Sequence, residues 1–329
     1  MRKPRSTLAV VLTLACFAPS AGAAGSTAAP FAADGWYTWR VTAVDDAPRW
    51  CCLDWVGGRA VPKACTLGDS HFSFGDDHSR LPTADTVQLY AQARGGELVR
   101  VRALSPACPV ENAVSLTDLG RIDPAASLAW LQPAALRDDS DALAAIAVHR
   151  GPEAFGFLTG LAQGDEDTDL REDAVFWLGQ VRIGEARDTL VALMFDDPDP
   201  AMREKAAFSI AQSTAPDRAD LLIRQGREDA DGDVRGQAWF WLAESGAPGC
   251  EPVIFEALRA DPDPDVREDA VFALSQLPDA RAVASLLQIV SDAGMAQELR
   301  EQALFWLVQS DSEEAYRAID RLFSAAPGR

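Results

Sequence analysis

The side chains of this chain best suited to hydrolytic chemistry lie in one short segment. Ser70 could serve as a nucleophile, and His71, Asp76 and His78 follow it within eight residues. A nucleophilic serine requires a histidine base that a third group orients. No histidine follows His149, and the chain contains no Gly-x-Ser-x-Gly elbow. A polar loop is therefore the preferred interpretation, and a hydrolase in this segment is the third alternative.

Metal binding is the second chemistry that the residue types allow. His71 and His78 could bind zinc, but two histidines without a third ligand at a defined spacing give weak support. The acidic turns could hold calcium. The closest of them, residues 228–233, has its glycine too early for an EF-hand loop and lacks the closing glutamate. Aspartates before proline also cap helices, so we predict no catalytic residue, metal or cofactor.

Cysteine usage points to an oxidising compartment. Four of the six cysteines lie between residues 51 and 108, as in a disulfide-stapled module. Neighbouring residues of a strand face opposite sides, so Cys51 and Cys52 are expected to bond to Cys65 and Cys108 rather than to each other. Which of them pairs with which stays open, and Cys250 is predicted to be a free, buried thiol.

The first 23 residues are predicted to be an export signal. Three basic residues precede an apolar stretch over residues 8–17, and Ala21-Gly22-Ala23 offers a small-residue cleavage site. The apolar stretch is shorter than the roughly 20 residues that a spanning helix needs, and no later segment is continuously apolar for that length. We expect no membrane span and a periplasmic or secreted protein. Lipid attachment at Cys16 is the less favoured alternative.

The net charge restricts the class of partner. It is −20 for the whole chain and −23 once the three basic residues of the signal are removed. Nucleic-acid binding normally needs a surface rich in lysine and arginine, and after the signal only Lys63 and Lys205 remain as lysines. We therefore expect no nucleic-acid partner, and the charge favours a basic protein partner.

One ten-residue phrase occurs five times after residue 170. It reads REDAVFWLGQ in its first copy, where Leu170, Ala174 and Leu178 form an apolar stripe at helical spacing, and a second apolar helix follows. A fixed period of about this length is typical of stacked helical repeats. The opening arginines are 32, 32, 32 and 33 residues apart: Arg171, Arg203, Arg235, Arg267 and Arg300.

The repeats resemble the HEAT-like repeats first associated with phycobilisome lyases, whose copies run Asp-Pro-x-x-x-Val-Arg-x-x-Ala-x-x-x-Leu. The resemblance covers residues 165–323 and implies an α-solenoid in which an arginine and an aspartate of the preceding turn form a ladder between repeats. It does not imply the lyase chemistry, because a fold does not determine a function. In the fifth copy Gly294 takes the place of the aspartate. The other four copies carry an aspartate six residues before the arginine: Asp165, Asp197, Asp229 and Asp261.

Residues 35–115 show a period of two in place of the helical spacing. Alternating apolar residues flank Arg94-Gly95-Gly96-Glu97, whose glycine pair is typical of a hairpin turn. We predict an α+β multidomain fold. Its parts are a small antiparallel β domain with disulfides over residues 35–115, a connection with a short helix begun by Asp123-Pro124 over 116–138, and an α-solenoid over 139–329 with a degenerate cap repeat and five full repeats.

One repeat position is always phenylalanine. Counted at about 100° per residue, Phe176 lies about 200° from Ala174, nearly opposite the buried stripe. Large exposed apolar surfaces generally mark interaction sites, so this column is the candidate partner-binding surface. The alternative is that its rings pack sideways against the adjacent repeat or the β domain. The column consists of Phe176, Phe208, Phe240, Phe272 and Phe305, and the following residues Trp177, Trp241 and Trp306 are expected on the buried side.

These observations predict a non-catalytic, exported scaffold that binds another protein. The partner would dock on the concave second helices or on the phenylalanine column. The alternative places binding of a carbohydrate or a cell-envelope ligand in the β domain, through exposed rings of Trp36, Trp39, Trp50 or Trp55. Buried rings would indicate a core, whereas a coplanar exposed pair would indicate a sugar site.

Overall fold

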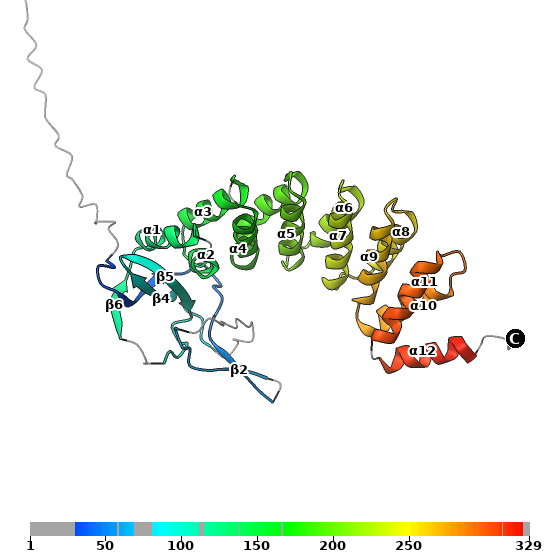
Figure 1. Cartoon of the computed structure of the whole chain (residues 1–329), viewed down its shortest axis with the longest axis horizontal. Helices are drawn as coiled ribbons and strands as arrows, with labels where there is room; N and C mark the ends of the chain where they lie inside the picture. Colours follow the sequence, from blue (N-terminus) through cyan, green and yellow to red (C-terminus); the bar gives the residue numbers. More distant parts are fainter. Residues whose placement is uncertain are drawn as a thin grey trace, which may run out of the picture.

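The computed structural model describes residues 30–57, 59–68, 81–111, 115–137, 139–165, 167–310 and 312–324. A small sheet lies at one end of a curved row of helices (Figure 1). The predicted export signal with Cys16, and the segment holding Ser70, His71, Asp76 and His78, lie outside the described residues. Within these ranges, no helix is long and apolar enough to cross a membrane.

Four strands form the main sheet, in the order β5-β4-β1-β6. They span Gly35–Thr42 (β1), Thr86–Arg94 (β4), Glu97–Leu104 (β5) and Leu116–Arg121 (β6). The predicted hairpin is confirmed, because Gly95 and Gly96 connect β4 to β5 with φ of 60° and 85°, a region that favours glycine. A separate hairpin of β2 (Leu53–Val56) and β3 (Arg59–Pro62) projects below the sheet in Figure 1.

The pairing of β6 differs from the predicted, purely antiparallel sheet. β6 runs parallel to β1, with Leu116 opposite Trp36, so the sheet is mixed. These six residues were predicted to be part of the connection, and their side chains are exposed or half-buried without alternation, which gives no strand signal. The predicted helix follows. Asp123 accepts hydrogen bonds from the N–H groups of residues 125 and 126 and caps α1 (Pro124–Ala135).

The sheet and the helices share one continuous core. α1 and α2 (Ser140–Ala147) pack against β1 and β5, and Trp39 of β1 is fully buried. The indole N–H of Trp39 donates to Ser127 Oγ of α1 at 2.8 Å. Arg182 donates to the carbonyl oxygen of Ala147, the last residue of α2, at 2.9 Å. The helices at the start of the solenoid therefore also support the sheet of the β domain.

The solenoid is a row of helix pairs. α4 contains both helices of one repeat, separated by a kink at Arg182, where φ is −126°. The five copies of the repeated phrase lie in the first half of α4 and in α5, α7, α9 and α11, which we call the first helices. The predicted cap repeat corresponds to α2 and α3. The bounds are Pro152–Gln163 (α3), Thr168–Asp196 (α4), Pro200–Ala211 (α5), Arg218–Glu228 (α6), Gly232–Glu244 (α7), Glu251–Ala260 (α8), Pro264–Ser275 (α9), Asp279–Ser291 (α10), Gln297–Gln309 (α11) and Glu313–Ser324 (α12).

The first helices bury the same repeat position against their neighbours. Small side chains there allow close helix packing, and a similar close approach occurs between α6 and α7. At Gly226 of α6, an added Cβ would lie 2.6 Å from the indole of Trp239. The buried alanines, each 0% exposed, are Ala174, Ala206, Ala238, Ala270 and Ala303.

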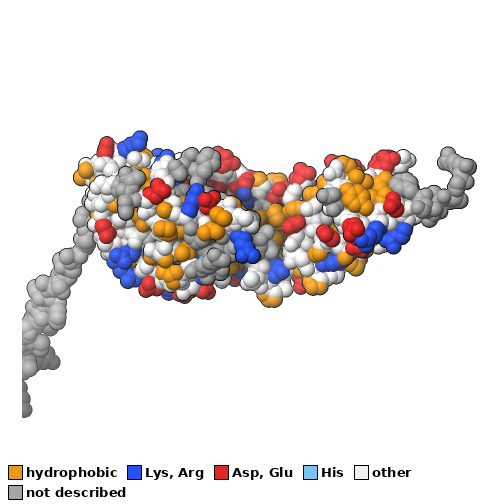
Figure 2. Space-filling view, turned by 90° about the horizontal axis from the view of Figure 1, so that it is seen from below, with side chains coloured by type: hydrophobic (Ala, Val, Ile, Leu, Met, Phe, Trp, Pro, Cys, Tyr) orange, Lys and Arg blue, Asp and Glu red, His pale blue; other side chains and the backbone are white. Residues whose placement is uncertain are grey.

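The row curves so that α5, α7 and α9 lie on its inner side and α6 and α8 on its outer side (Figure 1). The prediction that second helices line the concave surface is therefore wrong, because the first helices line it. Their phenylalanines point away from the buried alanines and hence toward this inner side. From below, the middle of the molecule is recessed between the β domain and the C-terminal helices (Figure 2).

A ladder of arginines and aspartates joins successive repeats, but its direction is opposite to the prediction. Arg203 donates from Nε and Nη2 to the two carboxylate oxygens of Asp229 at 2.9 and 2.8 Å, and Arg235 binds Asp261 in the same way at 3.0 and 2.9 Å. Each aspartate lies 26 residues after its arginine, in the following turn. The preceding aspartate contributes its backbone carbonyl, as where Arg235 Nη1 donates to Asp229 O at 3.0 Å.

Among the residues that the structure describes, the ladder has three rungs. The first joins Arg171 to Asp197. Asp165, predicted as a ladder residue, forms no ion pair with another described residue. The side chain of Arg267 likewise forms no hydrogen bond or ion pair within the described ranges. Asp292, which follows α10, has its Oδ2 4.0 Å from Nη2 of Arg259 instead. Arg300 donates to the carbonyl oxygen of Val290 at 3.1 Å and has no acidic partner there.

Candidate protein-binding surface

Nine aromatic side chains form a continuous line of ring contacts along the first helices. Neighbouring rings have centroid distances between 4.7 and 6.1 Å. The line begins in the β domain and ends on α11, so it crosses all five repeats. We call it the aromatic stripe, and its members are Trp50, Trp177, Phe176, Phe208, Trp241, Phe240, Phe272, Trp306 and Phe305.

Two kinds of ring contact alternate along the stripe. Phe176 and Phe208 stack nearly parallel, with centroids 6.1 Å apart and an interplanar angle of 7°. The next step is different, because Trp241 lies edge-on to Phe208 at 4.9 Å and separates it from the following phenylalanine. The residue after the phenylalanine is tryptophan in the first, third and fifth copies and small, Ser209 or Ala273, in the others. This alternation of sizes produces the alternation of contacts.

The rings pack sideways against neighbouring repeats and remain partly exposed. Four of the phenylalanines are half-buried, and Phe305 at the end is 51% exposed. Trp177 is buried, as predicted, whereas Trp241 and Trp306 are half-buried. The indole N–H groups of Trp177 and Trp306 are buried without a hydrogen-bond partner among the residues that the structure describes. The exposure of the stripe is thus intermediate between that of a buried core and that of a fully exposed apolar patch.

Carboxylates accompany the stripe one helical turn earlier. The second and third residues of each repeated phrase precede the phenylalanine by four and three positions, and therefore share its helix face. Four of the five copies have carboxylates there, namely Glu172, Asp173, Glu204, Glu268, Asp269 and Glu301, whereas the third copy has Gly236 and Gln237. Burial, and then the charges of neighbouring carboxylates such as Asp233, raise the pKa of Glu204 and of Asp269. Lys205 on the same face binds Glu172, with Nζ 3.1 Å from Oε2. The acidic side chains outnumber this cation, so the surface attracts positive charge.

The sequence of residues 156–238 and 220–307 matches the family model of HEAT repeats. Residues 156–307 are therefore HEAT repeats. The match confirms the resemblance inferred from the spacing of the repeated phrase. A comparison with curated proteins gave no match.

Several solved structures are similar to this HEAT repeat chain. The CpcE and CpcF complex of phycocyanin lyase from Nostoc sp. PCC7120 has 20% identity and a TM-score of 0.33, covering 66% of this chain and 97% of that one. Human deoxyhypusine hydroxylase in complex with glycerol has 15% identity and a TM-score of 0.23, covering 60% and 93%. The Mot1 N-terminal domain in complex with TBP has 18% identity and a TM-score of 0.31, covering 52% of this chain and only 25% of the Mot1 chain. With TM-scores this low, the assignment rests on residues 156–307.

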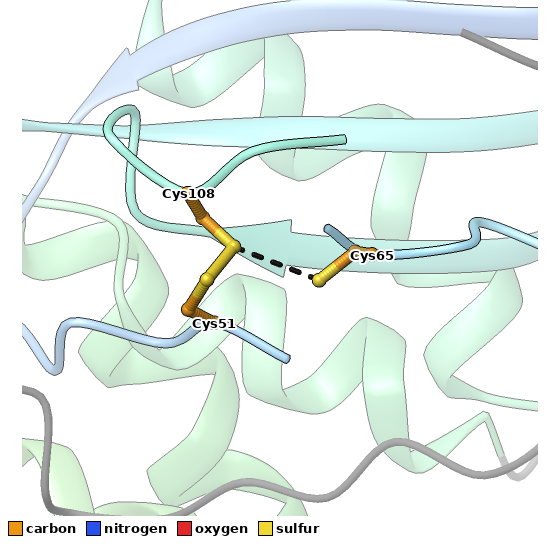
Figure 3. A group of neighbouring side chains, drawn as sticks. All are labelled: Cys51, Cys65 and Cys108. Carbon is orange, nitrogen blue, oxygen red and sulfur yellow. Dashed lines mark hydrogen bonds between the residues drawn. A yellow bond between two sulfur atoms is a disulfide. The ribbon is translucent and has the colours of Figure 1, made fainter. Parts of the chain in front are cut away.

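The cysteines preceding the HEAT repeats form two adjacent disulfides. Cys51 bonds to Cys108 and Cys52 to Cys65, so the two sequence neighbours do not bond to each other, as predicted. Sγ of Cys65 lies 3.6 Å from Sγ of Cys108, which brings three sulfur atoms together in Figure 3. Metal binding requires thiolates, and in this oxidised state these sulfurs cannot provide them. Cys250 is free and buried, in agreement with its prediction.

Three of the four tryptophans considered for carbohydrate binding belong to the core. Trp36, Trp39 and Trp50 are 7%, 0% and 6% exposed. Trp55, on the β2–β3 hairpin, is 68% exposed. These four rings therefore do not form a coplanar exposed pair. For the carbohydrate alternative, Trp55 is the one of the four that is exposed.

The structure brings together a serine and a histidine that the sequence did not connect. Ser127 Oγ and His149 Nε2 lie 2.8 Å apart, a distance typical of a nucleophile and its base. Both residues are buried, and Ser127 also accepts the hydrogen bond of Trp39. Burial, chiefly, lowers the pKa of His149 to about 4. The pair joins α1 to the residues that follow α2, inside the core, where a substrate has no access. No motif in the sequence linked Ser127 to His149.

The acidic turns considered for calcium are explained by capping and ladder contacts. Asp231 is the N-cap of α7 and accepts hydrogen bonds from the N–H groups of Asp233 and Val234 at 2.9 and 3.4 Å. Asp229 binds Arg203, so its carboxylate is already occupied. These contacts agree with the capping interpretation of the turns.

Proposed function

We propose that this chain is an exported, non-catalytic scaffold that binds a basic segment of another protein along the aromatic stripe. HEAT repeats are generally protein-interaction scaffolds, which supports the class of function. The observation that carries the proposal is the unbroken line of partly exposed rings over five repeats, with carboxylates beside it. Rings supply contact area, and carboxylates select a basic partner.

Two features support export. The sequence begins with a pattern typical of an export signal, and two disulfides connect residues of the β domain. Disulfides persist in oxidising compartments and are rare where thiols are kept reduced. A periplasmic or secreted localisation is therefore part of the proposal. Fractionation of cells and medium, with the chain detected through a C-terminal epitope tag, tests it.

Charge gives the interaction a dependence on salt. The chain carries a formal charge of −20, and the acidic residues beside the stripe lie at or near the surface. Long-range attraction to a basic partner is screened over about 10 Å at 0.1 M salt. The association rate should therefore fall as salt rises, while the dissociation rate, governed by the rings, changes less.

Site-specific crosslinking in the producing cells tests the proposal. A photoreactive amino acid at Phe240, on the stripe, is compared with the same group at Ala192, an exposed position on the second half of α4. We expect a partner crosslinked from Phe240 and not from Ala192. The same products from both positions would contradict docking on the stripe. Undiminished binding of that partner by a folded Phe208→Ser, Phe240→Ser variant would also contradict it.

A further inference from the structure

A pocket opens on the inner side of the solenoid where α4, α5 and α7 meet. Its volume is about 350 Å³, and it is open to solvent. This volume lies near the lower end of the range of ligand pockets, about 300–1,000 Å³, and is large enough for one long side chain. It lies on the aromatic stripe and is lined by Phe176, Phe208, Trp241, Glu172, Glu204 and Gln237, with Lys205 at its side.

Three aromatic rings form one wall of the pocket. Phe176 and Phe208 stack in parallel, and Trp241 meets Phe208 at an angle of 62°. Rings set at different angles offer faces toward a shared space, and aromatic faces attract cations through their quadrupole. Tryptophan gives the strongest attraction of the three ring types.

Two carboxylates line the same pocket beside the rings. Glu172 is occupied by Lys205 at 3.1 Å. Glu204 is half-buried, and its carboxylate forms no hydrogen bond or ion pair among the described residues. Burial raises its pKa, and so do the charges of Asp233, Asp231 and Glu172, against a smaller opposing effect of Arg203. The ionised form of Glu204 is thus destabilised in the free protein, and a bound cation would relieve that cost.

We infer that this pocket binds a cationic side chain of the partner, with Glu204 as its counterion and the rings of Phe208 and Trp241 against its positive group. Arginine suits the site best, because a planar guanidinium can stack on a ring while it donates hydrogen bonds to a carboxylate. Lysine is the other source of the same charge. This inference rests on the proposed function, since it names one anchor of a partner that docks on the stripe.

Short peptides test the pocket without knowledge of the partner. The probes are acetyl-Gly-Arg-Gly-amide, its lysine analogue, and its citrulline analogue, which keeps the shape of arginine without the charge. Binding to the full chain is followed by NMR at the side-chain amide of Gln237 and the indole N–H of Trp241. We expect shifts with arginine and lysine and none with citrulline. Equal shifts with all three probes, or none with any, would overturn the inference.

Substitution of the counterion separates this site from general acidity. Glu204→Gln should weaken arginine binding roughly tenfold, the factor that ~1.4 kcal/mol represents. The matched control is Glu153→Gln, an exposed glutamate in the first turn of α3, which lines no part of this pocket and lies on no helix of the stripe. It removes the same charge and should leave binding within about twofold. Equal losses in the two variants would overturn the assignment of Glu204.

A measurement on the free protein keeps the test independent of the probes. Because the ionised carboxylate is destabilised there, Glu204→Gln should raise the thermal midpoint at pH 7, whereas Glu153→Gln should not. A substitution that stabilises the free protein and weakens the complex indicates a binding residue. If the probes fail while the Phe240 crosslinks are still formed, the cation pocket is wrong and docking on the stripe stands. If the crosslinks fail as well, both are wrong.

Discussion

Removing one carboxylate from the middle of the ladder tests how the repeats are joined. The side chains of Arg203 and Asp229 are 11% and 5% exposed, and two hydrogen bonds of 2.8 and 2.9 Å connect them. Asp229→Asn keeps the size and one acceptor oxygen but leaves the guanidinium in a buried site without its counterion. Breaking a buried pair on one side costs about 3–5 kcal/mol. We expect a loss of about 3 kcal/mol, because the exposed edge of Arg203 still reaches water.

Urea unfolding followed by circular dichroism measures this loss. The control is Asp265→Asn, which removes the same charge from an exposed position in the first turn of α9 and should change the unfolding free energy by less than about 0.5 kcal/mol. The double variant Arg203→Gln, Asp229→Asn removes both charges and should recover at least about 1 kcal/mol relative to the sum of the single losses. A broader transition is also expected, because repeats contact only their neighbours and a weakened junction lets the two halves unfold separately.

Two results would refute this reasoning. Equal losses at Asp229 and Asp265 would show that the rung contributes nothing beyond general charge. Additive losses in the double variant would show that Arg203 and Asp229 do not act on each other, in spite of the distances between them.

Three further outcomes follow from the structure. Arg267→Gln, at the position without a rung, should cost less than about 0.5 kcal/mol in urea unfolding, whereas Arg235→Gln should cost about 3 kcal/mol. Gly226→Ala places a Cβ 2.6 Å from the indole of Trp239 and should cost about 2 kcal/mol by overpacking, visible as a lower thermal midpoint. The pKa of His149 is lowered to about 4, so the folded protein releases its proton more readily than the unfolded one, and stability is lost as pH falls from about 6.5 to 4. This loss, up to about 3 kcal/mol, should disappear from the pH dependence of unfolding in His149→Asn.

The sequence predicted the local elements well because each had its own chemical signal. The glycine pair after Arg94 forced the hairpin, and Asp123 before proline marked the start of α1. The adjacent positions of Cys51 and Cys52 indicated that each bonds to a more distant cysteine. The 32-residue period indicated stacked helix pairs. β6 was missed because its six residues neither alternate nor bury a face, so that only the register with β1 makes it a strand.

The direction of the ladder could not be read from the period. An aspartate six residues before one arginine is also 26 residues after the previous arginine, because the two spacings add to one repeat. Asp229 satisfies both descriptions. In the folded chain its carboxylate binds Arg203, while its backbone carbonyl accepts a hydrogen bond from Arg235. The curvature was similarly hidden, because which helix of a pair faces inward depends on small tilts between repeats.

The alternation of large and small side chains behind the phenylalanines makes the natural building block of this solenoid two repeats long. A shortened protein that lacks 64 residues would bring a tryptophan-bearing copy back beside a serine- or alanine-bearing one and restore every ring junction. Deleting one internal copy would break the alternation. Loss of the second or fourth copy sets two tryptophan-bearing copies side by side, and loss of the third sets the copies with Ser209 and Ala273 side by side. Growth or loss of this surface by duplication should therefore proceed in even steps.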